Sequence, residues 1–168
     1  MINSKTQRLV FAALFAALTF VGTMIIRIPT PGTSGYIHLG DTFVVLSGII
    51  LGPVYGALAA GIGSALADLI GGYFLYIPAT FIIKALIALG VALIYHKFTP
   101  SKLAPTVKCI ICGIYSTLFV AIGYFIFEVF IYGAGALASV PANLIQGVSG
   151  LIFSTILLPL LLRVRKTA

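Results

Sequence analysis

The chain has 168 residues, of which 61% are hydrophobic and only 8% are charged. A soluble domain carries about 25% charged residues, so this composition excludes a soluble protein and predicts an integral membrane protein. At about 20 apolar residues per spanning helix, five or six helices account for nearly the whole chain, leaving no room for a separate soluble domain.

Six apolar segments follow one another along the chain and predict a single all-α membrane domain over residues 1–168. Pro29 closes the first segment, Gly52-Pro53 separates the second from the third, and Gly71-Gly72 closes the third. The second segment is short for an upright span, and it could instead form a tight hairpin with the third. The expected helices cover approximately residues 8–28, 42–52, 54–70, 78–96, 107–132 and 141–163.

The net charge of +7 is concentrated in three places. Eight of the ten basic residues lie before the first helix, between the fourth and fifth, or after the sixth. The positive-inside rule makes these segments cytoplasmic, which favours six crossings with both termini inside, because five would place the basic C-terminus outside. The basicity therefore indicates orientation and not a nucleic-acid partner. The eight residues are Lys5, Arg8, Lys97, Lys102, Lys108, Arg163, Arg165 and Lys166.

A few polar side chains fall inside the expected helices, where a charge costs about 2.5–3.5 kcal/mol near the bilayer centre. From the rise of about 1.5 Å per residue, they share one layer in the outer half of the membrane, above an apolar inner half. This asymmetry predicts a cup that is open to the outside, with a closed floor. The residues are Asp68, Lys84, Glu128, Asn143 and Gln146. Lys84 and Glu128 either form a structural ion pair or meet a ligand.

Other side chains face the same layer by helical spacing. Tyr124 lies on the same side of the fifth expected helix as Glu128. Thr80 lies on the same side of the fourth as Lys84. Tyr73 and Tyr76 lie at the same outer level. Both are either binding residues or members of an interfacial aromatic belt.

The stretch TPGTSGYIHLGDTFVVL (residues 30–46) joins the first two helices on the outer side, above this layer. Its glycines provide the mobility that a lid needs, and Tyr36, His38 and Asp41 can then contact a ligand below. Two of these residues have simpler interpretations. His38 could be an ordinary surface histidine, and Asp41 could be the N-cap of the second helix.

Small residues recur every fourth position on two helices. In the third, the stripe of Gly52, Gly56, Ala60 and Ser64 predicts close packing inside the fold. In the first, Ala12 pairs with Ala16 and Ala13 with Ala17. The alanine pairs fit either internal packing or docking onto another membrane protein. The two cysteines, Cys109 and Cys112, lack nearby ligands and are expected to be apolar helix residues.

The alanine-rich first helix, six helices in a chain of this length, and the stretch GYIHLGDTFVVLSGIILGPVYGALAAGIGSALADLIGGY together resemble the substrate-binding S components of energy-coupling factor (ECF) vitamin transporters. The closest resemblance is to the subgroup for pyridoxine-type vitamin B6 or hydroxymethylpyrimidine. It implies that the first loop is a lid, and that the subunit topples when docked on a transmembrane T component with two ATPases. It also implies that Ala12, Ala13, Ala16 and Ala17 contact the T component.

We therefore expect a lipid-embedded subunit of the bacterial plasma membrane that captures a B6 vitamer such as pyridoxine or pyridoxamine. The chain has no nucleotide-binding loop of its own, and no cofactor or metal site is expected. The alternatives are an S component for hydroxymethylpyrimidine or another vitamin, and a self-sufficient permease. An intramembrane enzyme would need a nucleophile–base or metal constellation, which the sequence does not provide at a plausible depth.

Overall fold

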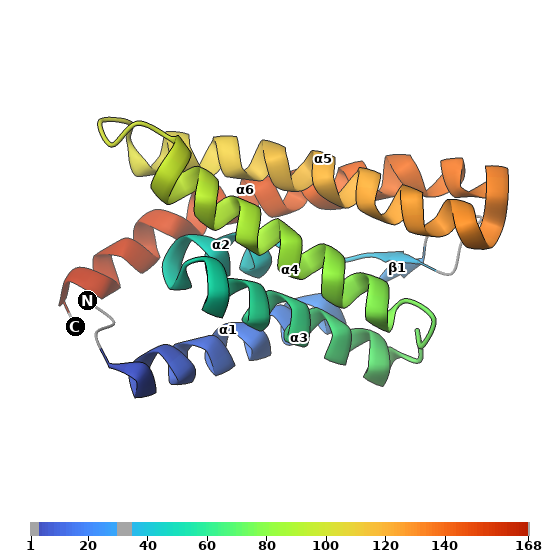
Figure 1. Ribbon diagram of the computed structural model, residues 1–168, viewed down its shortest axis with the longest axis horizontal. Coiled ribbons are helices and arrows are strands. Elements are labelled where there is room, and N and C mark those ends of the chain that lie inside the picture. Colours follow the sequence, from blue (N-terminus) through green and yellow to red (C-terminus); the bar gives the residue numbers. More distant parts are fainter. Residues whose placement is uncertain (1–3, 30–34, 168) are drawn as a thin grey trace.

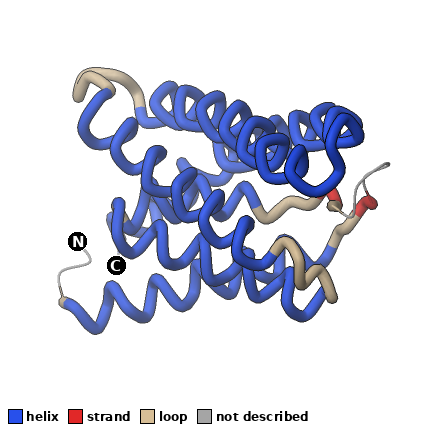
Figure 2. Tube along the Cα trace, turned by 45° about the vertical axis from the view of Figure 1, so that its right-hand side comes forward, coloured by secondary structure: helices blue, strands red, loops and turns tan. Residues whose placement is uncertain are grey.

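The computed structural model describes residues 4–29 and 35–167, so residues 30–34 of the expected lid lie outside it. Within these ranges the chain forms six α-helices and one short antiparallel β-ribbon (Figures 1 and 2). A π-helical turn, Ile94–Phe98, extends α4, and a 3-10 helix, Gly133–Ser139, joins α5 to α6. The elements are α1 (Lys5–Ile25), β1 (Ile28–Pro29), β2 (Tyr36–Ile37), α2 (Asp41–Leu51), α3 (Pro53–Gly71), α4 (Ile77–Leu93), α5 (Pro105–Tyr132) and α6 (Val140–Thr167).

Four stretches of the described chain are long and apolar enough to cross a membrane: Lys5–Ile25, Pro53–Gly71, Ile77–Phe98 and Pro105–Arg163. The last stretch is 59 residues long and contains both α5 and α6. α2 has 11 residues, or roughly 16 Å at the helical rise, which is too short for the hydrocarbon core of about 30 Å. The number of crossings therefore remains a prediction.

α2 is the innermost helix. It forms a hairpin with α3, which was one of the two arrangements considered from the sequence. Eight of its eleven residues are buried. The hairpin turns at Gly52, whose φ of 79° lies in the region that favours glycine. A Cβ atom at Gly56 would lie 2.7 Å from the Ser47 carbonyl oxygen, so the small residue permits the close approach of α3 to α2.

The small-residue stripe of α3 faces the interior. Gly56, Ala60 and Ser64 are all buried. On an adjacent face, a Cβ atom at Gly63 would lie 2.4 Å from the Ala16 carbonyl oxygen, which brings α1 against α3. Of the alanine pairs on α1, Ala12 and Ala16 are half-buried against the core, whereas Ala13 and Ala17 are exposed. The two pairs therefore present different faces.

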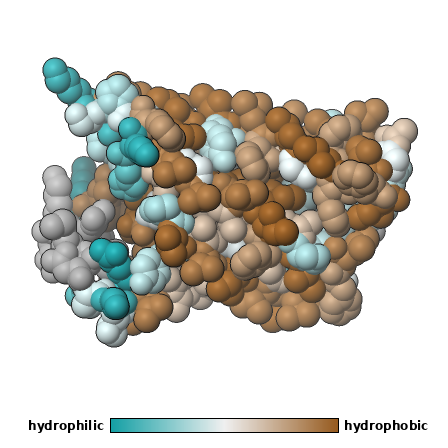
Figure 3. Space-filling view, in the orientation of Figure 1, coloured by the Kyte–Doolittle hydropathy of each residue, from teal (hydrophilic) through white to brown (hydrophobic). Residues whose placement is uncertain are grey.

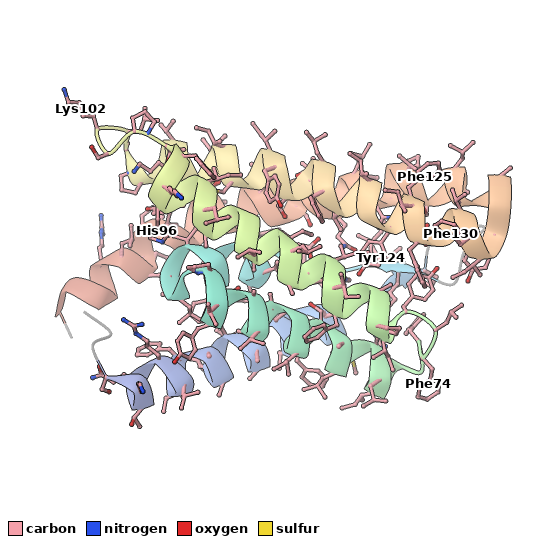
Figure 4. The ribbon with its side chains drawn as sticks, in the orientation of Figure 1. Phe74, His96, Lys102, Tyr124, Phe125 and Phe130 are labelled. Carbon is pink, nitrogen blue, oxygen red and sulfur yellow. The ribbon has the colours of Figure 1, made fainter. Side chains whose placement is uncertain are left out.

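The surface is apolar over the length of the helices, and hydrophilic side chains gather at one end (Figure 3). That end holds the start of α1, the end of α6 and the loop before α5, including Lys102, while β1 lies at the other end (Figures 1 and 4). Cys109 and Cys112 are fully buried on α5. Apart from Arg27, which directly precedes β1, the basic residues at this end match the charge distribution that the sequence shows.

Candidate functional site

A small internal cavity of about 20 Å³ lies at the end of the bundle that carries the β-ribbon. Its walls come from β2, the segment before α2, and helices α3 to α6, so distant parts of the chain meet there. Figure 4 shows Tyr124, one of the lining residues, on the β1 side of the bundle and away from Lys102. The lining residues are Gly35, Tyr36, His38, Asp68, Tyr76, Thr80, Tyr124, Glu128, Asn143 and Gln146.

Nine of the twelve residues predicted to bind substrate line this cavity. The exceptions are Asp41, Tyr73 and Lys84. Tyr73 instead packs on Tyr36, with ring centroids 4.4 Å apart. Asp41 and Lys84 lie just behind the wall, where both are fully buried.

Lys84 does not pair with Glu128, the partner considered from the sequence; its ammonium forms a salt bridge with Asp41. Gln146 Nε2 donates to the second Asp41 oxygen at 2.9 Å. The Lys84 ammonium also lies 5.3 Å from the centroid of the Tyr124 ring. Because a buried charge is tolerated when it is paired and hydrogen-bonded, this network ties α2, α4 and α6 together.

His38 is buried, at 6% exposure, and is not a surface residue. Its backbone N–H donates to Gln146 Oε1 at 3.3 Å, and its Nδ1 accepts from the Gly40 N–H at 3.0 Å. This acceptor role places the ring proton of the neutral imidazole on Nε2. Burial, followed by the charge of Lys84, lowers the pKa of His38 to about 3. The segment before α2 thus enters the bundle, and side chains satisfy its backbone donors.

Glu128 on α5 is a buried carboxylate with a partner on each oxygen. Tyr76 Oη donates to Oε1 at 2.9 Å, and the Ser139 hydroxyl donates to Oε2. Asn143 Nδ2 donates to the same Ser139 oxygen at 3.4 Å. Ser139 did not emerge from the sequence because a single serine in a connecting segment carries no distinguishing signal.

Asp68 lies near the C-terminal end of α3. A hydrogen bond is made by only one of its two carboxylate oxygens among the described residues. Tyr36 Oη donates to Oδ1 at 2.7 Å, which connects the β-ribbon to α3. Oδ2 is buried and has no hydrogen-bond partner within the described ranges. The hydroxyls of Thr80 and Tyr124, which also line the cavity, share a hydrogen bond of 3.0 Å.

A second, larger hollow of about 600 Å³ lies between α1 and α3 and is almost wholly apolar. All four alanines predicted to dock a partner line it. Leu58, Ile62 and Leu66 of α3 form part of its other side, with exposures between 42% and 47%. We call this hollow the α1–α3 groove.

The fold and site define a multi-pass membrane protein with a polar cavity, and the comparisons identify the family. The family model for the ECF-type riboflavin transporter S component matches residues 3–163. The chain therefore belongs to the ECF-type riboflavin transporter S component family, whose members are transport subunits and not enzymes.

One solved structure and two relatives are similar to this chain. A solved structure of the S component of a bacterial ECF transporter superimposes with a TM-score of 0.71 over 97% of this chain and 99% of its own, at 22% identity. The Lactococcus lactis thiamine precursor transporter HmpT is 28% identical over 165 residues, covering 97% of this chain and 92% of HmpT. A Pyrococcus woesei protein described as "Uncharacterized protein in gap 3'region" is 35% identical over 133 residues, 79% of this chain and 86% of that protein.

Proposed function

We propose that the chain captures a small nitrogen-containing heteroaromatic compound from outside the cell, and that the substrate is hydroxymethylpyrimidine, a precursor of thiamine. The cavity beneath the β-ribbon carries this proposal, because it combines aromatic rings with amides and carboxylates in an S-component fold. The similarity to HmpT supports a thiamine precursor as the substrate. This replaces the B6 vitamer first expected from the sequence, for which no comparison offers support.

The cavity chemistry suits such a ring. Tyr36, Tyr76 and Tyr124 offer aromatic surface, and Asn143 and Gln146 offer amides that can pair with a hydroxymethyl group. B6 vitamers are the second candidate, since the Asp68 and Glu128 carboxylates also suit the ammonium of pyridoxamine.

Substrate entry requires the lining to move. A volume of about 20 Å³ accommodates about one water molecule, which is much less than an aromatic ring. β2 is the lining element with the fewest helical neighbours, and Tyr36 attaches it to α3 through one hydrogen bond and the Tyr73 contact. Displacement of β2 is therefore the simplest way to open the cavity.

Delivery depends on partners in this proposal. The α1–α3 groove accepts the transmembrane T component of an ECF module with two ATPases, and the subunit topples on that module in the plasma membrane. All four alanines line the groove. Ala13 and Ala17 are exposed and provide the surface for close helix contact, whereas Ala12 and Ala16 are half-buried against the core of this chain. The positive-inside rule puts the basic end in the cytoplasm in this proposal, so the cavity, which lies at the other end of the bundle, faces outward.

Calorimetry on the purified chain tests the substrate, with hydroxymethylpyrimidine, pyridoxine, pyridoxamine and riboflavin as separate titrants. We expect saturable binding of hydroxymethylpyrimidine, at least about tenfold tighter than that of the others. Preferred binding of riboflavin or a B6 vitamer would overturn the pyrimidine assignment, and binding of none would overturn the whole substrate class.

Uptake assays test the partner. Cells that express this chain without the T component and ATPases should accumulate no substrate, whereas undiminished uptake would identify a self-sufficient permease. The double variant Ala13→Leu, Ala17→Leu should retain ligand binding but lose uptake, because the larger side chains block close helix approach. The matched exposed-face variant Leu14→Ala should retain both.

A further inference from the structure

Asp68 differs from the other buried carboxylates of the cavity region in its pairing. It is 4% exposed, lines the cavity, and uses only Oδ1 for a hydrogen bond within the protein. Oδ2 has no hydrogen-bond partner among the residues that the structure describes. The Thr80 hydroxyl also interacts with this carboxylate, and it shares a hydrogen bond with the Tyr124 hydroxyl in which either oxygen can be the donor.

An unpaired buried acceptor is costly unless another donor completes it. We propose that Asp68 Oδ2 accepts a hydrogen bond from an N–H group of the substrate, so that the protein selects amino-substituted heterocycles that are neutral or cationic. The inference rests on the proposed function, and it specifies which group of the ligand the site recognises. For a pyrimidine, that feature is the exocyclic 4-amino group.

The charge of the lining supports the same ligand class. Two carboxylates, Asp68 and Glu128, line the cavity, and no lysine or arginine does so among the described residues. Lys84 lies behind the wall and is already paired with Asp41. Arg27 does not line the cavity, and its guanidinium lies 5.7 Å from the centroid of the Tyr36 ring. A phosphate or carboxylate on the ligand would therefore meet two acids and no cation in the described lining.

Asp68 also connects ligand recognition to the β-ribbon. Its other oxygen, Oδ1, accepts from Tyr36 Oη, and Tyr36 belongs to β2. A substrate that binds Oδ2 thus meets the same carboxylate that holds β2 in place. The Asp68 carboxylate would therefore accept hydrogen bonds from both the bound substrate and Tyr36 of the β-ribbon.

The test is a comparison of two ligands on two proteins. The ligands are 4-amino-5-hydroxymethyl-2-methylpyrimidine and its 4-methoxy counterpart, which carries an ether oxygen in place of the amino group and has no N–H group. Wild-type protein should prefer the amino compound by roughly 10–100-fold, the range for a hydrogen bond to a charged group. In Asp68→Asn, Tyr36 keeps the side-chain oxygen and the amide NH₂ faces the cavity, so the preference should vanish or reverse.

Glu128→Gln is the matched control, because Glu128 is a buried lining carboxylate with both oxygens already paired. It should change the affinities for the two ligands by the same factor. Asp68→Ser provides a second neutral variant, and thermal unfolding in detergent confirms that each variant is folded. If Asp68→Asn is not folded, the loss of preference is read from Asp68→Ser.

Three results would overturn the inference while leaving the proposed function intact. These are a wild-type preference below about threefold, an unchanged preference in the folded Asp68 variants, and tight binding of the phosphate ester of the amino compound. Failure of both pyrimidines to bind wild-type protein is a different outcome, because it would remove the proposed function itself.

Discussion

Asp41 and Asp68 are both aspartates buried in the same bundle, yet their surroundings differ. Asp41 has a lysine on one oxygen and the Gln146 amide on the other, and it lies outside the cavity lining. Asp68 lines the cavity, with Tyr36 on one oxygen and no hydrogen-bond partner on the other among the described residues. Complete pairing indicates a structural role, whereas incomplete pairing beside a cavity indicates recognition of a ligand.

The largest expected effect comes from removing the lysine of the structural pair. Lys84→Met leaves the Asp41 charge buried without its counter-ion, which should lower the free energy of unfolding by about 3–5 kcal/mol. Denaturant unfolding in detergent measures it, and adding Asp41→Asn should restore most of the loss. Normal stability with abolished ligand binding would instead assign Lys84 to the ligand and remove the contrast with Asp68.

Gln146 bonds to Asp41 and also lines the cavity, so its replacement should change both the unfolding free energy and the ligand affinity. Gln146→Leu removes the bonds to Asp41 and to the His38 backbone, and should cost about 1–3 kcal/mol of unfolding free energy. Ligand affinity should fall as well, because Gln146 lines the cavity. The control is Asn143→Leu, which removes one long bond of 3.4 Å to Ser139. It should lower affinity with a smaller change in stability.

The smallest effect is a pH dependence that originates at His38, between β2 and α2. Because burial and Lys84 lower the pKa of His38 to about 3 in the folded protein, the unfolded chain takes up a proton first as the pH falls below about 6.5. Stability should therefore be complete above that pH and decrease by up to about 1.4 kcal/mol per unit below it. Unfolding midpoints between pH 7 and 5 measure the slope.

His38→Asn retains an acceptor for the Gly40 N–H and removes the titration, so it should flatten that slope. An equal slope in the variant would show that His38 is accessible to protons in the folded state. That result would place the segment before α2 at the surface, and not inside the bundle.

The sequence predicted the polar layer because charges and amides inside apolar segments are rare and costly. Asp68, Glu128 and Gln146 could be placed at a common depth by counting residues, and the structure brings all three to one cavity. The α2–α3 hairpin was among the considered alternatives because Gly52-Pro53 breaks the helix. These features depend on local chemistry alone.

The partners of the charges could not be predicted in the same way. Glu128 was considered as the partner of Lys84 because both lie inside expected helices. Asp41 was placed in the loop before the second helix or at the N-cap of that helix. Its burial depends on α2 being short and starting inside the bundle, which is a matter of how helices pack. His38 was interpreted either as a lid residue that contacts the ligand or as a surface histidine, and Ser139 was overlooked.

The burial of Cys109 and Cys112 has a practical consequence. These are the only thiols in the sequence, and both are fully enclosed by neighbouring side chains. Maleimide reagents should therefore leave the native protein largely unmodified, and a cysteine introduced at exposed Lys102 would take up a fluorophore selectively. Reorientation of the subunit relative to the bilayer could then be followed optically in a background that retains every natural residue but one.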